Sequence, residues 1–252
     1  MEAGIQGTRV QKAMARAGIA SRRQAERMMA SGFVKINGEE VRTPGVVLMP
    51  GDVLEVEGAV VEWERPTASQ VWAFYKPKRC VCTLRDPHDR RTIQAYFPRS
   101  AGRLFPIGRL EYDDEGLLLL TNDGEYARKV GHPSFQIPRI YLIKIRGVLP
   151  AAMVNRIRME LGGEIPGTEG SLKPLHKVGE KSWLELAVRR KNQRSIRRMF
   201  EKAGHPVLKQ KRYAIGPIEL DALKPGESRK LGKSELARLL AAGIPREEER
   251  TK

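Results

Sequence analysis

Residues 107–124, with the sequence IGRLEYDDEGLLLLTNDG, decide how the larger part of this 252-residue chain folds. The four leucines at 117–120 form a run that is too short to span a membrane and too apolar for an exposed loop. They therefore predict a buried strand that ends in a turn at 122–124. Arg109 and several acids come directly before this strand. Because a buried strand fixes the loop that precedes it, we expect this loop to hold a reactive carboxylate.

The composition is that of a globular protein that binds a polyanion. Hydrophobic residues make up 40% of the chain, which is enough for a core, and the formal net charge is +16 with a pI near 10.1. Such a charge is expected of a protein that binds nucleic acid. An anionic membrane is the rival partner. The chain has no long basic amphipathic helix with bulky apolar anchors, so RNA or DNA is favoured.

Neither a membrane span nor a signal peptide is expected. No apolar stretch approaches the roughly 18 residues that a spanning helix needs. The first residues, MEAGIQGTRVQK, lack the apolar core of a signal peptide. We therefore expect a cytoplasmic protein without a membrane partner.

The cysteines and histidines form no metal-binding pattern. Cys80 and Cys82 are separated by one residue, which matches neither of the usual zinc spacings, and the four histidines are scattered. We expect two reduced strand cysteines and no metal site.

Residues 9–62 predict a small module with two helices and a short sheet. Apolar residues recur on one helical face at 9–17, and Ser21 with Gln24 three residues later forms a capping box for a second helix. The Asn37-Gly38 dipeptide then predicts a hairpin.

Charge is sorted along this module. Between residues 9 and 35, seven lysines and arginines oppose only Glu26, whereas between 39 and 62 six acids oppose only Arg42. Positive potential confined to the helices indicates a docking surface. From charge alone, a merely solvated helix face remains the alternative.

Residues 65–70, RPTASQ, have the polar, proline-containing composition of a linker, so we place a domain boundary near residue 66. Beyond it, the pattern predicts strands near 71–75, 116–121, 139–146, 183–188 and 206–215, and helices near 151–160, 195–203 and 233–242. This mixture favours an α+β fold with a mostly antiparallel sheet. Residues 246–252 have the composition of a solvated tail.

Several motifs carry a resemblance to a known family. RVQKAMARAGIASRRQAERMMASGFVKINGEEV, at 9–41, is similar to an S4 RNA-binding domain. The later segments resemble bacterial ribosomal-RNA pseudouridine synthases of the S4-domain-containing, RsuA-like family, in family order: KPKRCVCTLRDPHDRRTI, GRLEYDDEGLLLLTNDG, HPSFQIPRIYLIKIRG and RSIRRMFEKAGHPVLKQKRYAIGPIEL. The resemblance covers nearly the whole chain. It implies a small S4 domain at 1–65, joined by a linker to a synthase domain at 66–245.

The resemblance also implies an activity, the isomerisation of a specific uridine in ribosomal RNA to pseudouridine. This chemistry needs a carboxylate, a nearby cation and a pocket for an extruded base, and it needs no cofactor. The expected partner is ribosomal RNA or a pre-ribosomal particle, and we expect a monomer.

Four residues match the catalytic positions of the family. Glu111 occupies the position of the catalytic acid, and Arg109 is the arginine that flanks it. Tyr141 matches the tyrosine that lies against the target base. Arg197 matches the arginine that pairs with the catalytic carboxylate, so the resemblance predicts an ion pair between Glu111 and Arg197.

Further cations are expected to contact RNA. Residues 189–213 contain ten lysines and arginines against the single acid Glu201, more than a solvated helix face explains. The predicted RNA contacts are Arg9, Lys12, Arg22, Arg23 and Arg27 in the S4 domain, and Arg139, Arg190, Lys191, Arg194 and Arg198 in the synthase domain.

The chain departs from the family at the centre of the site. Glu111 stands where the family carries aspartate, which moves the carboxylate outward by about 1.5 Å, and a misplacement of about 1 Å can cost roughly 100-fold in rate. RKNQRS, at 190–195, replaces an EGRNRQ-like segment. In the family register Asp113 and Asp114 lie past the catalytic position, so neither is expected to replace it.

Three activities are compatible with these departures. The first is a working synthase with an adjusted pocket, and the second is a catalytically silent RNA-binding relative that acts in ribosome assembly. The third is an S4-type RNA-binding protein with another task.

Overall fold

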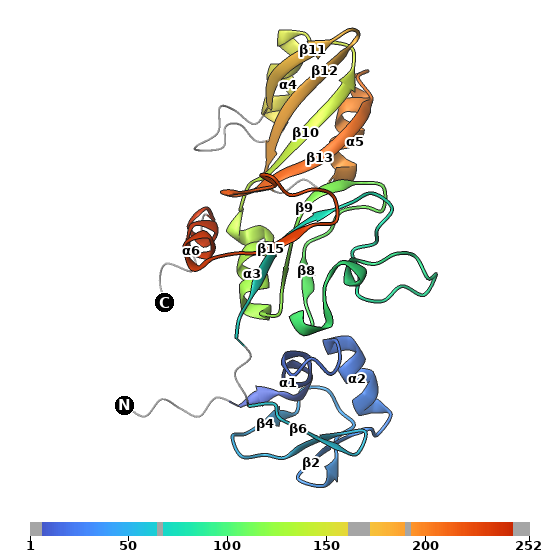
Figure 1. Ribbon diagram of the computed structural model, residues 1–252, viewed down its shortest axis with the longest axis vertical. Coiled ribbons are helices and arrows are strands. Elements are labelled where there is room, and N and C mark those ends of the chain that lie inside the picture. Colours follow the sequence, from blue (N-terminus) through green and yellow to red (C-terminus); the bar gives the residue numbers. More distant parts are fainter. Residues whose placement is uncertain (1–6, 65–67, 161–171, 190–192, 244–252) are drawn as a thin grey trace. The chain divides into compact units, whose positions relative to one another are not determined.

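The computed structural model of the protein describes residues 7–64, 68–160, 172–189 and 193–243. The chain divides into two compact units, Met1–Ser69 and Gln70–Lys252 (Figure 1). No helix in these described parts is both long enough and apolar enough to cross a bilayer.

The first unit consists of two helices and short strands, as predicted for the S4 domain. Ser21 caps the second helix, because its Oγ accepts a hydrogen bond from the Gln24 amide at 3.2 Å. Asn37 and Gly38 have φ values of 52° and 87°, the left-handed conformation that a tight hairpin requires. The elements are β1 (Thr8–Arg9), α1 (Val10–Arg16), α2 (Arg22–Ala30), β2 (Val34–Ile36), β3 (Glu39–Glu40), β4 (Val47–Leu48), β5 (Leu54–Val56) and β6 (Ala59–Val61).

The second unit is built on one nine-stranded sheet with the order β11-β12-β10-β13-β9-β7-β15, to which β14 adds beside β13 and β8 beside β9. Every pairing is antiparallel except that of β13 with β9. The strands are β7 (Val71–Lys76), β8 (Phe105–Ile107), β9 (Glu115–Thr121), β10 (Arg139–Arg146), β11 (Leu172–Val178), β12 (Lys181–Val188), β13 (Val207–Ile215), β14 (Ile218–Glu219) and β15 (Ser228–Lys230). The predicted α+β class with a mostly antiparallel sheet is confirmed.

Four α-helices pack on this sheet. They are α3 (Gly124–Gly131), α4 (Ala151–Glu160), α5 (Gln193–Lys202) and α6 (Lys233–Ala241), and three short 3-10 helices lie at Ile93–Tyr96, Arg99–Ala101 and Pro133–Phe135. Side chains of α3 and α6 share one apolar cluster with β7 and β9, whereas α4 and α5 share another with β10 and β12. The leucines of 117–120 are 0–1% exposed, so the predicted buried strand is confirmed.

Several elements of the second unit were not predicted: the helix α3, the strands β8, β11, β14 and β15, and the three 3-10 helices. The segment after β9 was expected to be only a turn, but Asp123 caps α3, since its carboxylate accepts hydrogen bonds from the amides of Glu125 and Tyr126 at 2.9 and 3.1 Å. The same residue types favour turns and helix starts, which explains the miss. Strand β11 was also missed, because its seven residues include two lysines, a histidine and a proline and do not alternate regularly between apolar and polar.

Candidate active site

The loop at 108–114 connects β8 to β9, and a buried lysine holds it through hydrogen bonds to its backbone. Lys76, at the end of β7, is 0% exposed. Its Nζ donates hydrogen bonds to the carbonyl oxygens of Pro77, Glu111 and Asp114 at 3.0, 3.0 and 2.7 Å. Burial lowers the pKa of Lys76 from its ordinary value. Lys76 therefore fixes the backbone of the acidic loop at Glu111 and Asp114, and the sequence prediction did not single it out.

A second buried cation holds the other end of the loop. Arg212 of β13 is 2% exposed, and its guanidinium donates to the carbonyl oxygens of Leu117 and Arg109 at 2.7 and 3.3 Å. Gly116 lies against the same residue. A Cβ at this position would be 2.3 Å from the Arg212 carbonyl oxygen, and φ is +127°, so only glycine fits.

Two carboxylates of the loop meet two arginines of α5. The Arg194 guanidinium lies 3.3 Å from the Glu111 carboxylate, and Arg197 forms an ion pair with Asp114. Arg194 and Arg197 are three residues apart and so lie on the same side of the helix. The loop and the helix therefore face each other, as the family resemblance led us to expect.

The pairing differs from the predicted one. We expected Glu111 to pair with Arg197. In the structure Arg197 pairs with Asp114, and Glu111 pairs with Arg194. The Asp114 side chain is 2% exposed and the Glu111 side chain is 56% exposed. Asp114 stands immediately before the buried strand β9, so its short side chain points inward, whereas Glu111 lies farther out on the loop.

The oxygens of Asp114 are used unequally. Oδ1 accepts from Arg197, while Oδ2 is buried and has no hydrogen-bond partner among the described residues. The Arg197 side chain is 43% exposed, so the protein does not enclose it on all sides. Asp114 thus anchors one side of an arginine whose other side is available to a ligand.

The remaining predicted site residues differ in burial and in their contacts. Tyr141 on β10 is 2% exposed and belongs to the same apolar cluster as Ile196 of α5. Arg139 is half-buried, and its guanidinium donates to the Arg189 carbonyl oxygen at 3.2 Å. Burial lowers the pKa of Arg139. The Arg109 side chain is exposed.

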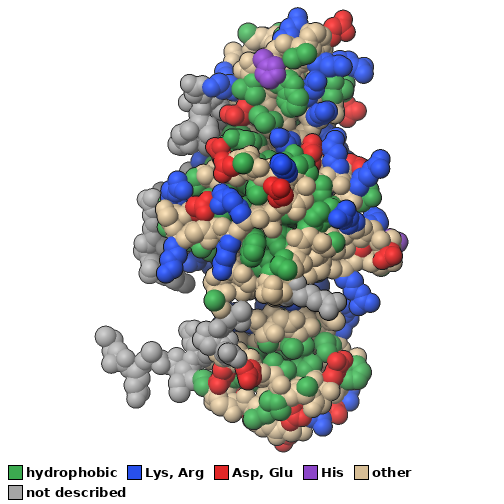
Figure 2. Space-filling view, viewed as in Figure 1, with side chains coloured by type: hydrophobic (Ala, Val, Ile, Leu, Met, Phe, Trp, Pro, Cys, Tyr) green, Lys and Arg blue, Asp and Glu red, His purple; other side chains and the backbone are tan. Residues whose placement is uncertain are grey.

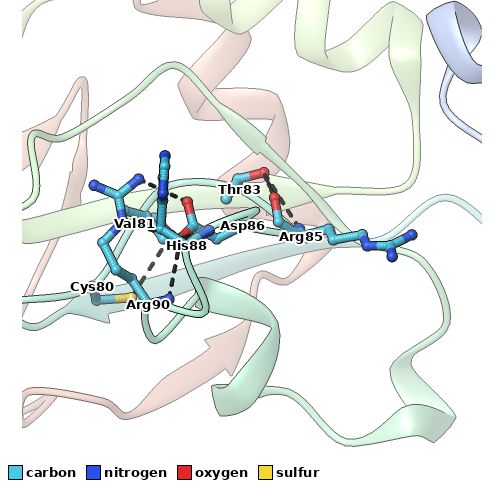
Figure 3. A network of polar contacts seen from close by, with 7 residues as sticks. All are labelled: Cys80, Val81, Thr83, Arg85, Asp86, His88 and Arg90. Atoms are coloured by element: carbon cyan, nitrogen blue, oxygen red, sulfur yellow. Dashed lines mark hydrogen bonds and ion pairs between the residues drawn. The ribbon is translucent and has the colours of Figure 1, made fainter.

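A cationic loop contacts the outer part of the site. Asp86 accepts hydrogen bonds from the Arg90 guanidinium at 3.0 and 2.8 Å and from the amides of His88 and Arg90, both at 3.1 Å (Figure 3). These contacts lower the pKa of the Asp86 carboxyl well below its usual range, chiefly through the Arg90 side chain. The Arg90 guanidinium also lies 5.9 Å from the centre of the Tyr112 ring.

Cys80 and Cys82 are free thiols. They lie outside the named strands, so the expectation of strand cysteines was wrong. The Leu110 amide donates to Cys82 Sγ at 3.3 Å. Burial raises the pKa of Cys80 to about 11, which keeps its thiol protonated and unreactive near neutral pH.

Most of the predicted RNA contacts are exposed cations. In the first unit they lie on or next to α1 and α2, and in the second unit Arg194 and Arg198 lie on α5. Arg190 and Lys191 lie outside the described residues. The exposed set in the first unit is Arg9, Lys12, Arg22, Arg23 and Arg27.

Comparison with known sequences identifies the family of both units. The sequence model described as RNA pseudouridylate synthase matches residues 70–210, and that of the S4 domain matches residues 8–54. The chain belongs to the RNA pseudouridylate synthase family. The carboxylate loop and the arginines of α5 lie within residues 70–210, and Arg212 of β13 lies just beyond them.

Relatives match over nearly their full length. The ribosomal large subunit pseudouridine synthase B of Bacillus subtilis is 39% identical over 92% of this chain and 96% of its own. An RNA pseudouridine synthase of Aquifex aeolicus is 37% identical over 93% and 94% of the two chains. A crystal structure of a pseudouridylate synthase, 28% identical, aligns with a TM-score of 0.60 over 92% of this chain and 99% of that one.

Proposed function

We propose that this synthase isomerises a uridine of ribosomal RNA to pseudouridine, with Glu111 as the reacting carboxylate. The observation that carries the proposal is the meeting of the acidic loop at 108–114 with two arginines of α5. The name of the Bacillus subtilis relative supports ribosomal RNA, and specifically the large subunit, as the substrate.

The reaction conserves all atoms and electrons of the nucleotide. The bond between ribose C1′ and uracil N1 breaks, the base turns, and a bond forms between C1′ and C5. The proton leaves C5 and N1 ends protonated, so no oxidant or reductant takes part. The carboxylate acts on the ribose, as a nucleophile or as a base, while the site holds the loosened uracil.

Glu111 is suited to the reacting role because it is an accessible acid of the loop that pairs with an arginine of α5. Its carboxylate is 56% exposed and can touch a nucleotide, whereas Asp114 is 2% exposed. The Arg194 guanidinium pairs with the Glu111 carboxylate and orients it. An exposed ion pair is worth only about 0–1 kcal/mol in water. RNA that covers the pair excludes water and strengthens it, so Arg194 acts mainly in the complex.

Asp114 has a different part, as the positioning residue for Arg197. A buried carboxylate that pairs with one side of a guanidinium fixes its direction. The exposed side of Arg197 is then available for a phosphate or for the target base. The family resemblance assigns Tyr141 to contact with the flipped uracil; because its side chain is 2% exposed, bound RNA would first have to uncover it.

RNA affinity in this proposal comes from exposed cations in both units. Contacts of lysines and arginines with phosphates make binding depend on salt but carry little sequence information. The S4 helices would grip structured RNA, and the cations of α5 would hold the strand that contains the target. The protein would act as a cytoplasmic monomer.

Mapping of pseudouridine on ribosomal RNA tests the proposal directly. Purified protein is incubated with transcripts of both ribosomal RNAs, which carry no modified nucleotides, and each uridine is then scored for conversion. We expect one or a few sites in the large-subunit transcript to be converted. Conversion only in the small-subunit transcript would refute the subunit assignment while leaving the activity intact.

One observation favours a second candidate function. Glu111 is longer than the family aspartate and pairs with Arg194 instead of Arg197, so the site departs from the family arrangement in both the length of the acid and its partner. If these departures abolish turnover, the protein would bind ribosomal RNA during ribosome assembly. Tight binding of the transcripts without any product would support this function and reject the enzyme proposal.

A further inference from the structure

The four strands β11, β12, β10 and β13 have two different faces. On one face, the side chains of Tyr141, Ile143 and Ile145 enter the apolar cluster that includes α4 and α5. Since side chains alternate along a strand, Leu142 and Lys144 point to the opposite face. From Leu142 to Arg146, and at the residues paired with them on that face, the side chains are partly or fully exposed. Figure 2 shows Lys and Arg side chains gathered along the β13 side of these strands.

A row of side chains crosses this open face perpendicular to the strands. The pairing register places His176 opposite Trp183, Trp183 opposite Lys144, and Lys144 opposite Lys209. The rings of His176 and Trp183 are stacked, with centroids 6.2 Å apart and 29° between their planes. The Lys144 ammonium lies 5.4 Å from the Trp183 ring centre. The row therefore combines two flat rings with two cations.

The neighbouring rows repeat the positive charge. Arg146 lies opposite Lys181, and the next row in the other direction contains Lys173, Glu185, Leu142 and Lys211. Glu185 is the one acid in these three described rows. Like charges placed directly opposite each other on neighbouring strands destabilise a sheet. The Lys144–Lys209 and Arg146–Lys181 pairs therefore work against the fold, and the fold alone does not explain them.

We propose that this open face, defined by His176, Trp183, Lys144 and Lys209, is a second RNA-binding surface that takes an unpaired segment of the substrate RNA. A polyanion removes the repulsion between the opposed cations, and a base can stack on an exposed ring between them. Sheet faces with an aromatic side chain among cations suit single-stranded RNA, whose bases are free to stack. The inference depends on RNA as the partner in the proposed function, but not on the catalytic roles given above.

A double variant, Lys144→Gln/Lys209→Gln, tests the surface. Loss of two phosphate contacts should weaken binding of a ribosomal RNA transcript about tenfold at low salt and make the slope of log K against log salt shallower by about 1.4 to 1.8. The unfolding free energy should stay equal or rise, because the repulsion is removed. A side chain with a merely structural role would not give weaker binding together with equal or greater stability. Lys224→Gln/Lys230→Gln is the matched control, since both lysines are exposed and the change in charge is identical.

Oxidative labelling of Trp183 by hydroxyl radicals gives a readout on the unaltered protein. We expect bound transcript to protect Trp183. Unchanged labelling of Trp183 in the complex, or a salt slope equal to that of the control pair, would overturn the inference. Protection by an acidic polypeptide but not by RNA would overturn it as well, in favour of a protein partner. Pseudouridine formation is scored in the same samples, so that loss of product refutes the proposed function, while product without protection of Trp183 refutes only the surface.

Discussion

Asp114 and Arg197 form the least solvent-exposed charge pair of the candidate site, and their coupling can be measured. Asp114→Asn keeps the shape of the side chain but removes the charge that orients Arg197. We expect kcat to fall about 10- to 100-fold with little change in KM, as for a group displaced by about 1 Å. The Asp114→Asn/Arg197→Gln double variant should be no slower than Arg197→Gln alone, since both changes disable one unit.

The neighbouring acid provides the control for this cycle. Asp113 is exposed and lies in the same loop, so Asp113→Asn makes the same change in charge without touching the pair. Its kcat should stay close to that of the wild type. Additive losses in the double variant would show that Asp114 does not act through Arg197.

Gly116 is required where the acidic loop enters β9. A Cβ would lie 2.3 Å from the Arg212 carbonyl oxygen and 2.5 Å from its amide nitrogen. We expect Gly116→Ala to lower the unfolding free energy by about 3 kcal/mol or more, through a backbone clash and strain at positive φ. Urea unfolding followed by circular dichroism measures the loss.

Gly108, in the same loop, separates strain from the clash. It also has positive φ, at 80°, but a Cβ there would meet no atom within 4 Å. Gly108→Ala should therefore cost only about 1–2 kcal/mol. Equal losses at the two positions would contradict the close approach at Gly116.

At the scale of elements, the loop around Asp86 should make the unfolding free energy fall at low pH. The contacts with Arg90 hold the folded pKa of Asp86 below its ordinary value of 3.8. The stabilisation is therefore present above that value and is lost as the pH falls through the folded pKa. We expect the wild type to be more stable than Asp86→Asn at pH 7, and the difference to shrink below about pH 4.

Asp89→Asn is the control for this pH series, because Asp89 is an exposed acid of the same loop. Its unfolding free energy should follow that of the wild type at every pH. A difference between the wild type and Asp86→Asn that stays constant from pH 7 to pH 3 would show that the Arg90 contact is not responsible.

The elements also show which parts of the fold can be predicted from local sequence patterns. Four consecutive leucines and the Asn37-Gly38 dipeptide have one structural meaning each, so the strand β9 and the hairpin could be predicted. Asp123 followed by glycine fits both a turn and a helix cap, and only the packing of α3 against β8 and β9 decides between them. The predictable elements are those whose local pattern already excludes the alternatives.

For the whole molecule, the sequence predicted that a loop near Glu111 and a helix near Arg197 would meet, but it predicted the wrong partners. Motif positions say which segments approach each other. They do not say which of two acids three residues apart faces inward, because the backbone path set by Lys76 and Arg212 decides this. These two buried cations appear in the sequence as ordinary members of a chain with 46 lysines and arginines.

The central claim is that Glu111 is the carboxylate that acts on the target uridine. The most direct measurement is the single-turnover rate of pseudouridine formation on unmodified large-subunit ribosomal RNA, for the wild type, Glu111→Gln and Asp114→Asn. We expect Glu111→Gln to bind the RNA normally but to form no product, and Asp114→Asn to remain slow but active. Product formation by Glu111→Gln at the wild-type rate, with none by Asp114→Asn, would contradict the account and assign the reaction to the buried acid.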